Sequence, residues 1–313
     1  METDYRPELD VSPTLGLAEV NYYQSQTGVL RWAVELGRMD IATKVSMLTS
    51  HNALPCEGHL TAVFHIFSYL KTKGNARLVL DPTYAAIDYD AFPQQDWSEF
   101  YGDTPKHIPS NVPPPMGRPV EVWCYVDADH AGDTLTRKSR TGIVIFLNLA
   151  PIVWYSIKQN TVETSTFGSE FVALKVATEI LCGLRYKLRM MGIPIVGPSY
   201  IHCDNNLVVL VTSTGPASTL KKKSNFIAYH AVRWSVAADK QRVTHTASEK
   251  SPLDLMTKPL LGGAKRDYLV SQVLHDIVNE VTPKLRDLRD SAVKVLSSTV
   301  RFPLAQTMPT YAL

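Results

Sequence analysis

The sequence predicts an α/β protein in which a small, mostly helical segment precedes a mixed five-stranded sheet with flanking helices. Between residues 17 and 80, apolar positions recur at spacings of three and four, which is typical of amphipathic helices. After residue 118 the pattern changes to short apolar runs separated by turn residues, and helical stretches follow. This change of pattern predicts two structural units of different class.

Composition favours a globular intracellular protein. The chain has 313 residues, of which 45% are hydrophobic, so it can bury a core. Its net charge of +2 does not indicate a nucleic-acid binder as a whole, so any such role depends on local basic clusters. The four cysteines form no CxxC pair, which favours reduced thiols over a zinc site or disulfides. The N-terminus lacks the pattern of a secretion signal, and no run is suited to spanning a membrane.

Four segments are predicted along the chain. Residues 1–80 form the helical unit, and residues 81–118, which lose periodicity and end in IPSNVPPPMGRP, form a linker. Residues 119–281 form the α/β domain, and residues 282–313 form a weakly ordered tail.

Within the α/β domain, each element follows from a local pattern. VEVWCYVD, TGIVIFLN and PIVWYSIK predict three antiparallel strands, and apolar positions from about 167 to 191 predict a long helix. SYIHCD predicts a fourth strand, followed by helices beginning near Asn205 and in the basic run LKKKSNF. RVTHTA predicts a fifth strand, and SPLDLMTK the start of another helix.

Four carboxylates lie at the ends of these elements: Asp127, Glu170, Asp204 and Asp254. Each has a local structural explanation, as a turn residue, a first-turn acid or a helix cap. The alternative is that strand ends and helix starts gather them into one site. Converging carboxylates repel unless cations lie between them, and oxygen ligands favour Mg²⁺ or Mn²⁺. Two such ions would suit hydrolysis of a phosphodiester.

The motifs YVDADHAGD, RKSRTG, PIVWYSIKQNTVETSTFGSEFVAL, IHCDNN and SPLDLMTKPL resemble, in family order, the ribonuclease H domain of copia-type retrotransposon polyproteins. Residues 27–71 resemble the C-terminal end of the reverse transcriptase that precedes this domain in such polyproteins. The resemblance implies a ribonuclease H-like core and assigns the catalytic and metal-binding roles to Asp127, Glu170, Asp204 and Asp254.

Two positions depart from the family pattern: Leu253 precedes Asp254 where alanine is usual, and Ser224 follows Lys223 where histidine is common. Nothing in the chain matches the paired aspartates of the polymerase site. The upstream palm and fingers are therefore expected to be missing. We also expect residues 1–80 to be poorly soluble alone, because their apolar face would be uncovered.

The implied activity is hydrolysis of the RNA strand of an RNA–DNA hybrid, using two Mg²⁺ or Mn²⁺ ions. His245 is a candidate for moving protons, although a histidine in a strand is more often structural. Two basic clusters could contact phosphates or could simply be solvated. They consist of Arg137, Lys138 and Arg140, and of Lys221, Lys222 and Lys223.

Two other functions compete with this prediction. One is a catalytically silent remnant of a truncated element that still binds nucleic acid. The other is an integrase or transposase on a related fold, for which the sequence offers no zinc-binding or basic tail module. The resemblance also implies a location in the cytoplasm, in virus-like particles, or in the nucleus.

Overall fold

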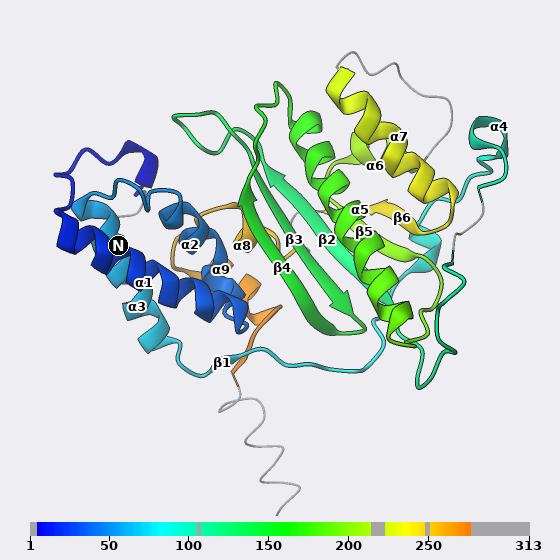
Figure 1. Ribbon diagram of the computed structural model, residues 1–313, viewed down its shortest axis with the longest axis horizontal. Helices are drawn as coiled ribbons and strands as arrows, with labels where there is room; N and C mark the ends of the chain where they lie inside the picture. The colour runs from blue at the N-terminus through cyan, green and yellow to red at the C-terminus, as the bar shows by residue number, and fades with distance from the viewer. Residues whose placement is uncertain (1–4, 105–107, 214–222, 248–250, 277–313) are drawn as a thin grey trace, which may run out of the picture.

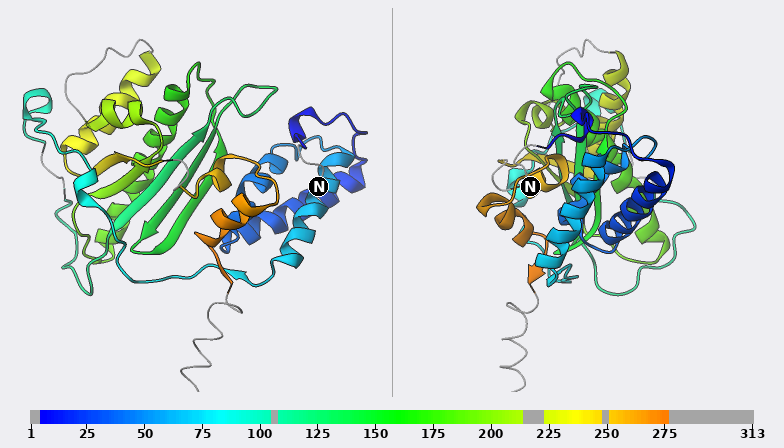
Figure 2. Two further views of the ribbon diagram at one scale, coloured as in Figure 1. Left: turned by 180° about the vertical axis from the view of Figure 1, so that it is seen from behind. Right: turned by 90° about the vertical axis from the view of Figure 1, so that its left-hand side faces the viewer.

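The computed structural model describes residues 5–104, 108–213, 223–247 and 251–276. The predicted tail at 282–313 lies outside these ranges. Figure 1 shows helices of the N-terminal unit on one side of the molecule and the sheet in its centre. Further helices lie on the opposite side, and helices α8 (Asp254–Thr257) and α9 (Ala264–Ser271) lie between the N-terminal unit and the sheet (Figure 2).

The central sheet has the order β4-β3-β2-β5-β6. The first three strands are antiparallel, whereas β5 pairs in parallel with β2, and β6 in parallel with β5. This confirms the predicted mixed five-stranded sheet. The strands are β2 (Val122–Asp129), β3 (Arg140–Leu147), β4 (Ala150–Lys158), β5 (Ser199–Cys203) and β6 (Gln241–His245).

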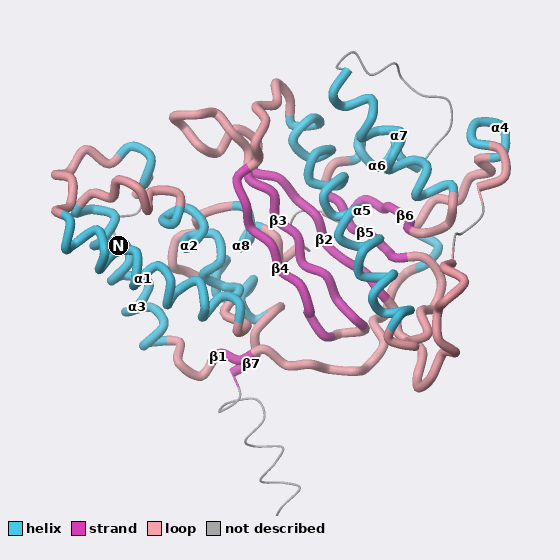
Figure 3. Tube along the Cα trace, viewed as in Figure 1, coloured by secondary structure: helices cyan, strands magenta, loops and turns pink. Residues whose placement is uncertain are grey.

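One face of the sheet packs against three helices, which Figure 3 shows beside the strands: α5 (Thr166–Met190), α6 (Asn206–Ser213) and α7 (Lys223–Ala237). Alternate residues of β2 point to this face, from Val122 to Ala128, and α5 supplies Phe171 and Leu174. Along the apolar side of α5, Ala177, Leu181 and Leu188 are also buried and Leu184 is partly buried. Met191 lies beyond the helix and is 72% exposed.

The N-terminal unit has its own small core. It contains α1 (Leu17–Glu35), the 3₁₀ turn η2 (Met39–Ile41), α2 (Ala42–Thr49) and α3 (Glu57–Thr72), preceded by the 3₁₀ turn η1 (Pro7–Leu9). Tyr23 and Leu30 of α1 and Val63 of α3 are fully buried in this core. Trp32 and Leu36, on the outer side of α1, are more than half exposed.

The other face of the sheet joins the two units. Trp123, Val144 and Phe146 on the strands pack with Met39 and Ala42 of the N-terminal unit, in a core completed by α8 and α9. The second sheet also joins distant segments, because β1 (Ala76–Arg77) pairs with β7 (His275–Asp276). The N-terminal unit therefore shares a hydrophobic core with the sheet.

Two side chains of the segment predicted as a linker pack against the sheet. It forms a 3₁₀ turn, η3 (Tyr89–Ala91), and a short helix, α4 (Ser98–Tyr101). Its Phe92 and Trp97 are almost fully buried, against opposite faces of the sheet. Two aromatic side chains spaced five residues apart gave no periodic signal, which is why the sequence did not indicate this packing.

Gly142 allows α8 to approach β3 closely. A β-carbon at Gly142 would lie 2.6 Å from Thr257 Cγ2 and 2.8 Å from Met256 Cβ, which is closer than contact allows. We predict that Gly142→Ala lowers the free energy of unfolding by about 1–3 kcal/mol because α8 must shift. Urea denaturation measures this change.

The matched control is Gly183→Ala, in the exposed middle of α5, where a β-carbon meets nothing within 4 Å. There we expect a stabilisation of about 0.5–1 kcal/mol, from helix propensity. Equal effects of the two substitutions would contradict the close packing of α8 on β3.

Candidate metal centre

The register of two parallel strands brings Asp127 and Asp204 together. Val126 of β2 pairs with Cys203 of β5, so the next residue of each strand, Asp127 and Asp204, follows at the same level. Asn205 stops β5 there, because its side-chain Oδ1 accepts hydrogen bonds from the backbone N–H groups of Leu207 and Val208 and caps α6. The predicted pairing of these two carboxylates is thus a consequence of strand order.

Glu170 enters the same site from α5. Ser165 caps this helix with its hydroxyl, which accepts a hydrogen bond from Gly168 N at 3.2 Å and places Glu170 one turn inside. Glu170 is 6% exposed, and the backbone N–H of Ala128 hydrogen-bonds to its carboxylate. Its second oxygen, Oε2, is buried without a hydrogen-bond partner among the residues that the structure describes. A buried carboxylate oxygen without a partner is costly and therefore calls for a cation or a proton.

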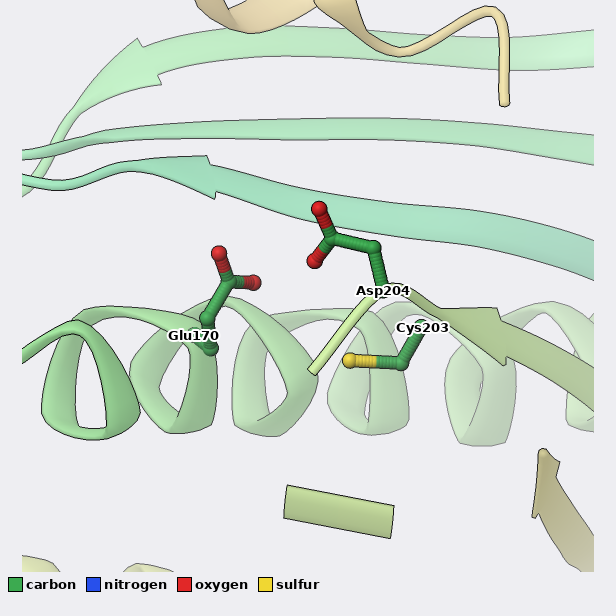
Figure 4. A group of neighbouring side chains, drawn as sticks. All are labelled: Glu170, Cys203 and Asp204. Atoms are coloured by element: carbon green, nitrogen blue, oxygen red, sulfur yellow. The ribbon is translucent and has the colours of Figure 1, made fainter. Parts of the chain in front are cut away.

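The ligand atoms of Glu170, Cys203 and Asp204 all lie within 4.8 Å of one another. Figure 4 shows the carboxylates of Glu170 and Asp204 directed toward the same space. Burial of Cys203 raises the pKa of its thiol well above the ordinary value, so the carboxylates are the better ligands for a hard cation.

Repulsion in this cluster is visible in two pKa values. Burial, and then the charges of Asp127 and Asp204, raise the pKa of Glu170 to about 10. Burial and the charge of Asp204 raise the pKa of Asp127 to about 6, although the hydroxyl of Thr257 donates a hydrogen bond to Asp127 Oδ2 at 2.7 Å and lowers it. The three carboxylates fit a divalent cation, whose positive charge would lower the pKa values of both Glu170 and Asp127.

Asp254 lies close enough to raise the pKa of Asp127, but it is held by two lysines. Lys258 Nζ is 2.5 Å from one of its carboxylate oxygens and Lys265 Nζ is 2.6 Å from the other. Burial raises the pKa of Asp254, but the hydrogen bonds from the two lysines lower it below its ordinary value. Asp254 begins α8, whose N-cap is Leu253, and the hydroxyl of Ser251 accepts a hydrogen bond from Leu253 N at 3.3 Å just before the helix.

His245 ends β6 beside the cluster. Its Nε2 lies 3.1 Å from the backbone oxygen of Asp204. A carbonyl oxygen only accepts hydrogen bonds, so Nε2 carries the proton in this contact and Nδ1 is left able to accept one. The position agrees with the proton-moving role expected from the sequence, which stays a prediction.

The first basic cluster divides between surface and interior. Arg137 is exposed and Lys138 is half-buried, so both side chains reach the surface where a phosphate could be contacted. Arg140 is only 8% exposed, and its Nη1 donates a hydrogen bond to Ser46 Oγ of α2 at 2.7 Å. The prediction of a phosphate contact is therefore wrong for Arg140, because α2 covers it. Lys221 and Lys222 lie outside the described residues, and Lys223 is the first residue of α7.

Three residues of the site were not assigned a role from the sequence. Thr257 holds Asp127, and Lys258 pairs with Asp254. Asp129, whose pKa is raised by burial, lies two residues after Asp127 and points to the same side of the sheet. All three residues belong to the DAD and TKPL motifs. The local sequence did not indicate which side chains they would contact in the folded chain.

The chain is similar to polyproteins of plant transposons. The chain is 26% identical over 262 residues to the "Retrovirus-related Pol polyprotein from transposon RE1" of Arabidopsis thaliana, which covers 84% of the chain. It is 24% identical over 254 residues, or 81% of the chain, to the corresponding polyprotein from transposon RE2 of the same plant. The chain spans 15% of the length of each relative. No family model matches.

Among solved structures, the crystal structure of LC11 ribonuclease H1 in complex with an RNA/DNA hybrid aligns with 45% of this chain and 96% of its own, at 17% identity and a TM-score of 0.35. The polyprotein relatives confirm the predicted relationship to retrotransposon Pol polyproteins. Among the helices that the structure describes, none is both long and apolar enough to cross a membrane.

If the cluster is built for a cation, Glu170→Gln should stabilise the cation-free protein at pH 8. The pKa of Glu170 is raised to about 10 in the folded chain, whereas in the unfolded chain it is near 4.5. Between these two values only the unfolded chain releases the proton readily. The stability of the folded wild type therefore falls as the pH rises from 4.5 toward 10. The melting temperature of the variant should thus exceed that of the wild type in EDTA, by a margin that grows from pH 5 to pH 8.

Added Mg²⁺ or Mn²⁺ should narrow this difference. At about ten times its Kd, a cation stabilises the wild type by roughly 1.4 kcal/mol, or about 2–4 °C. Glu170→Gln should respond less. Two results together would contradict a cation site at Glu170. The difference in melting temperature between variant and wild type would not change with pH, and the cation would raise both melting temperatures equally.

Proposed function

We propose that this chain is the ribonuclease H segment of a retrotransposon polyprotein and hydrolyses the RNA strand of RNA–DNA hybrids with the help of divalent cations. One observation carries the proposal: the carboxylates of Glu170 and Asp204 come within 4.8 Å of each other, Asp127 is close enough to raise the pKa of Glu170, and a buried carboxylate oxygen of Glu170 has no partner among the described residues. The transposon relatives support the same assignment.

Asp127, Glu170 and Asp204 would hold the cations, with Asp254 available to a second ion if its lysines release it. Bound there, Mg²⁺ or Mn²⁺ would activate a water molecule and stabilise the oxygen that leaves phosphorus. In the cleavage, water adds to phosphorus of an RNA phosphodiester, and the bond from phosphorus to the 3′ oxygen breaks.

The protein's own groups position this chemistry. Thr257 fixes the carboxylate of Asp127 by its hydrogen bond, and the backbone N–H of Ala128 fixes that of Glu170. His245 Nδ1 would accept a proton near Asp204 and return it to the leaving group. Lys258, half-buried next to Asp127 and Asp129, would attract the scissile phosphate.

We predict that the purified chain cleaves the RNA strand of an end-labelled hybrid in Mg²⁺ or Mn²⁺, and leaves the DNA strand intact. Asp127→Asn should lower the rate by about 100-fold or more, because removing partners of a metal ligand already costs about 10–100-fold. Gel electrophoresis of the two labelled strands gives the readout. The exposed Asp103, changed in the same way to asparagine, is the matched control and should retain the wild-type rate.

Cleavage of both strands, or equal rates for the two variants, would contradict the assignment. A folded chain that binds the hybrid without cutting it would favour the second candidate, a silent remnant. One observation favours this second candidate. Asp254, a predicted metal ligand, forms ion pairs with Lys258 and Lys265.

A further inference from the structure

A groove of about 540 Å³ lies between the N-terminal unit and the sheet domain. We call it the interdomain groove. Its N-terminal wall comes from residues 5–7 and from α2 and α3, where Met47 and Ile66 are lining residues. Its other wall comes from the loop after β2, between residues 129 and 137, and from residues 258–261. Neither unit forms the groove alone.

The groove is basic. Among the described residues that line it, four carry a positive charge, Arg6, Lys44, Arg137 and Lys258, and Asp129 carries the single negative charge. Two of the cations come from each wall. Burial, with the charge of Arg266, lowers the pKa of Lys44 to about 8, so the ammonium is still mostly charged at pH 7. This charge distribution is complementary to a polyanion.

The groove adjoins the metal centre. Lys258, which lines it, is bonded to Asp254 and lies near Asp127. Asp129, on the same wall as Lys258, follows Asp127 by two residues on β2. A strand with one phosphate at the cluster would therefore have its neighbouring phosphates within the groove.

The two walls are tied together by hydrogen bonds. Arg6 Nη1 donates to the backbone oxygen of Gly132 at 3.1 Å. Glu8 Oε1 accepts from the hydroxyl of Thr134 at 2.9 Å and from its backbone N–H at 3.2 Å. The N-terminal residues thus hold the loop that presents Arg137, and the groove is formed before a ligand arrives.

We propose that the interdomain groove binds the sugar–phosphate backbone of a nucleic-acid strand that continues from the metal centre, so that the N-terminal unit supplies part of the substrate contact. This inference rests on the proposed function. The four cations would contact phosphates, while Met47, Leu260 and Leu261 offer apolar surface to sugars. Four cations spread over two walls suit a chain of phosphates better than a single small anion.

The test measures binding without cleavage, by fluorescence anisotropy of a labelled RNA–DNA hybrid in an Asp127→Asn background. Lys44→Met is compared with Lys71→Met, which makes the same charge change at an exposed position of α3 outside the groove. At 100 mM salt, Lys44→Met should weaken binding about tenfold, and the slope of log K against log salt should fall by about one. Lys71→Met should change the affinity less than about twofold.

Arg137→Met provides a second variant, because Arg137 is exposed in a loop and its replacement leaves the core untouched. If Lys44→Met does not fold, as judged by circular dichroism, the loss in Arg137→Met carries the test. Groove variants that bind like Lys71→Met would overturn the inference and leave the proposed function standing. A folded chain that binds no hybrid at all would overturn both.

Discussion

The parallel pairing of β2 with β5 is the constraint on which the rest of the site depends. It sets Asp127 and Asp204 at one level, and α5 then adds Glu170 over the same strand ends. Three carboxylates that are brought together this way cannot all be charged in a buried site without a counter-ion. The site therefore stores repulsion in the folded chain, which a divalent cation would relieve. Thr257 and the N–H of Ala128 fix two of the three carboxylates in place.

The second face of the sheet explains why the N-terminal unit matters. Strand residues on this face, such as Trp123 and Val144, are buried by Met39 and Ala42 as well as by α8. The same docking covers Arg140 with α2, and it creates the groove beside the metal centre. Packing and substrate contact are thus two consequences of one interface. A unit that looks like a separate helical segment in the sequence is part of the sheet domain's core.

Much of the fold and the centre of the site could be predicted from local patterns. The three antiparallel strands and the long helix have strong periodicity, and Asp127, Glu170 and Asp204 lie at the ends of predicted elements. The family resemblance, rather than any local pattern, assigned their roles. What the sequence did not indicate depends on contacts between distant segments. The ion pair of Asp254 with Lys265 requires α9, and the burial of Arg140 requires Ser46, which lies 94 residues away in the chain. Phe92 and Trp97 are buried by tertiary packing that leaves no periodic trace.

The most direct test of the account is the ionisation of Glu170 itself. Nuclear magnetic resonance of the chain with ¹³C-labelled glutamate carboxyls would follow this group with pH, and the Glu170→Gln spectrum would assign its signal. In EDTA, we predict a carboxyl that titrates well above the usual range for glutamate, with a pKa that falls when Mg²⁺ is added. A carboxyl of Glu170 that titrates near 4.5 with and without Mg²⁺ would contradict a buried carboxylate cluster built for a cation.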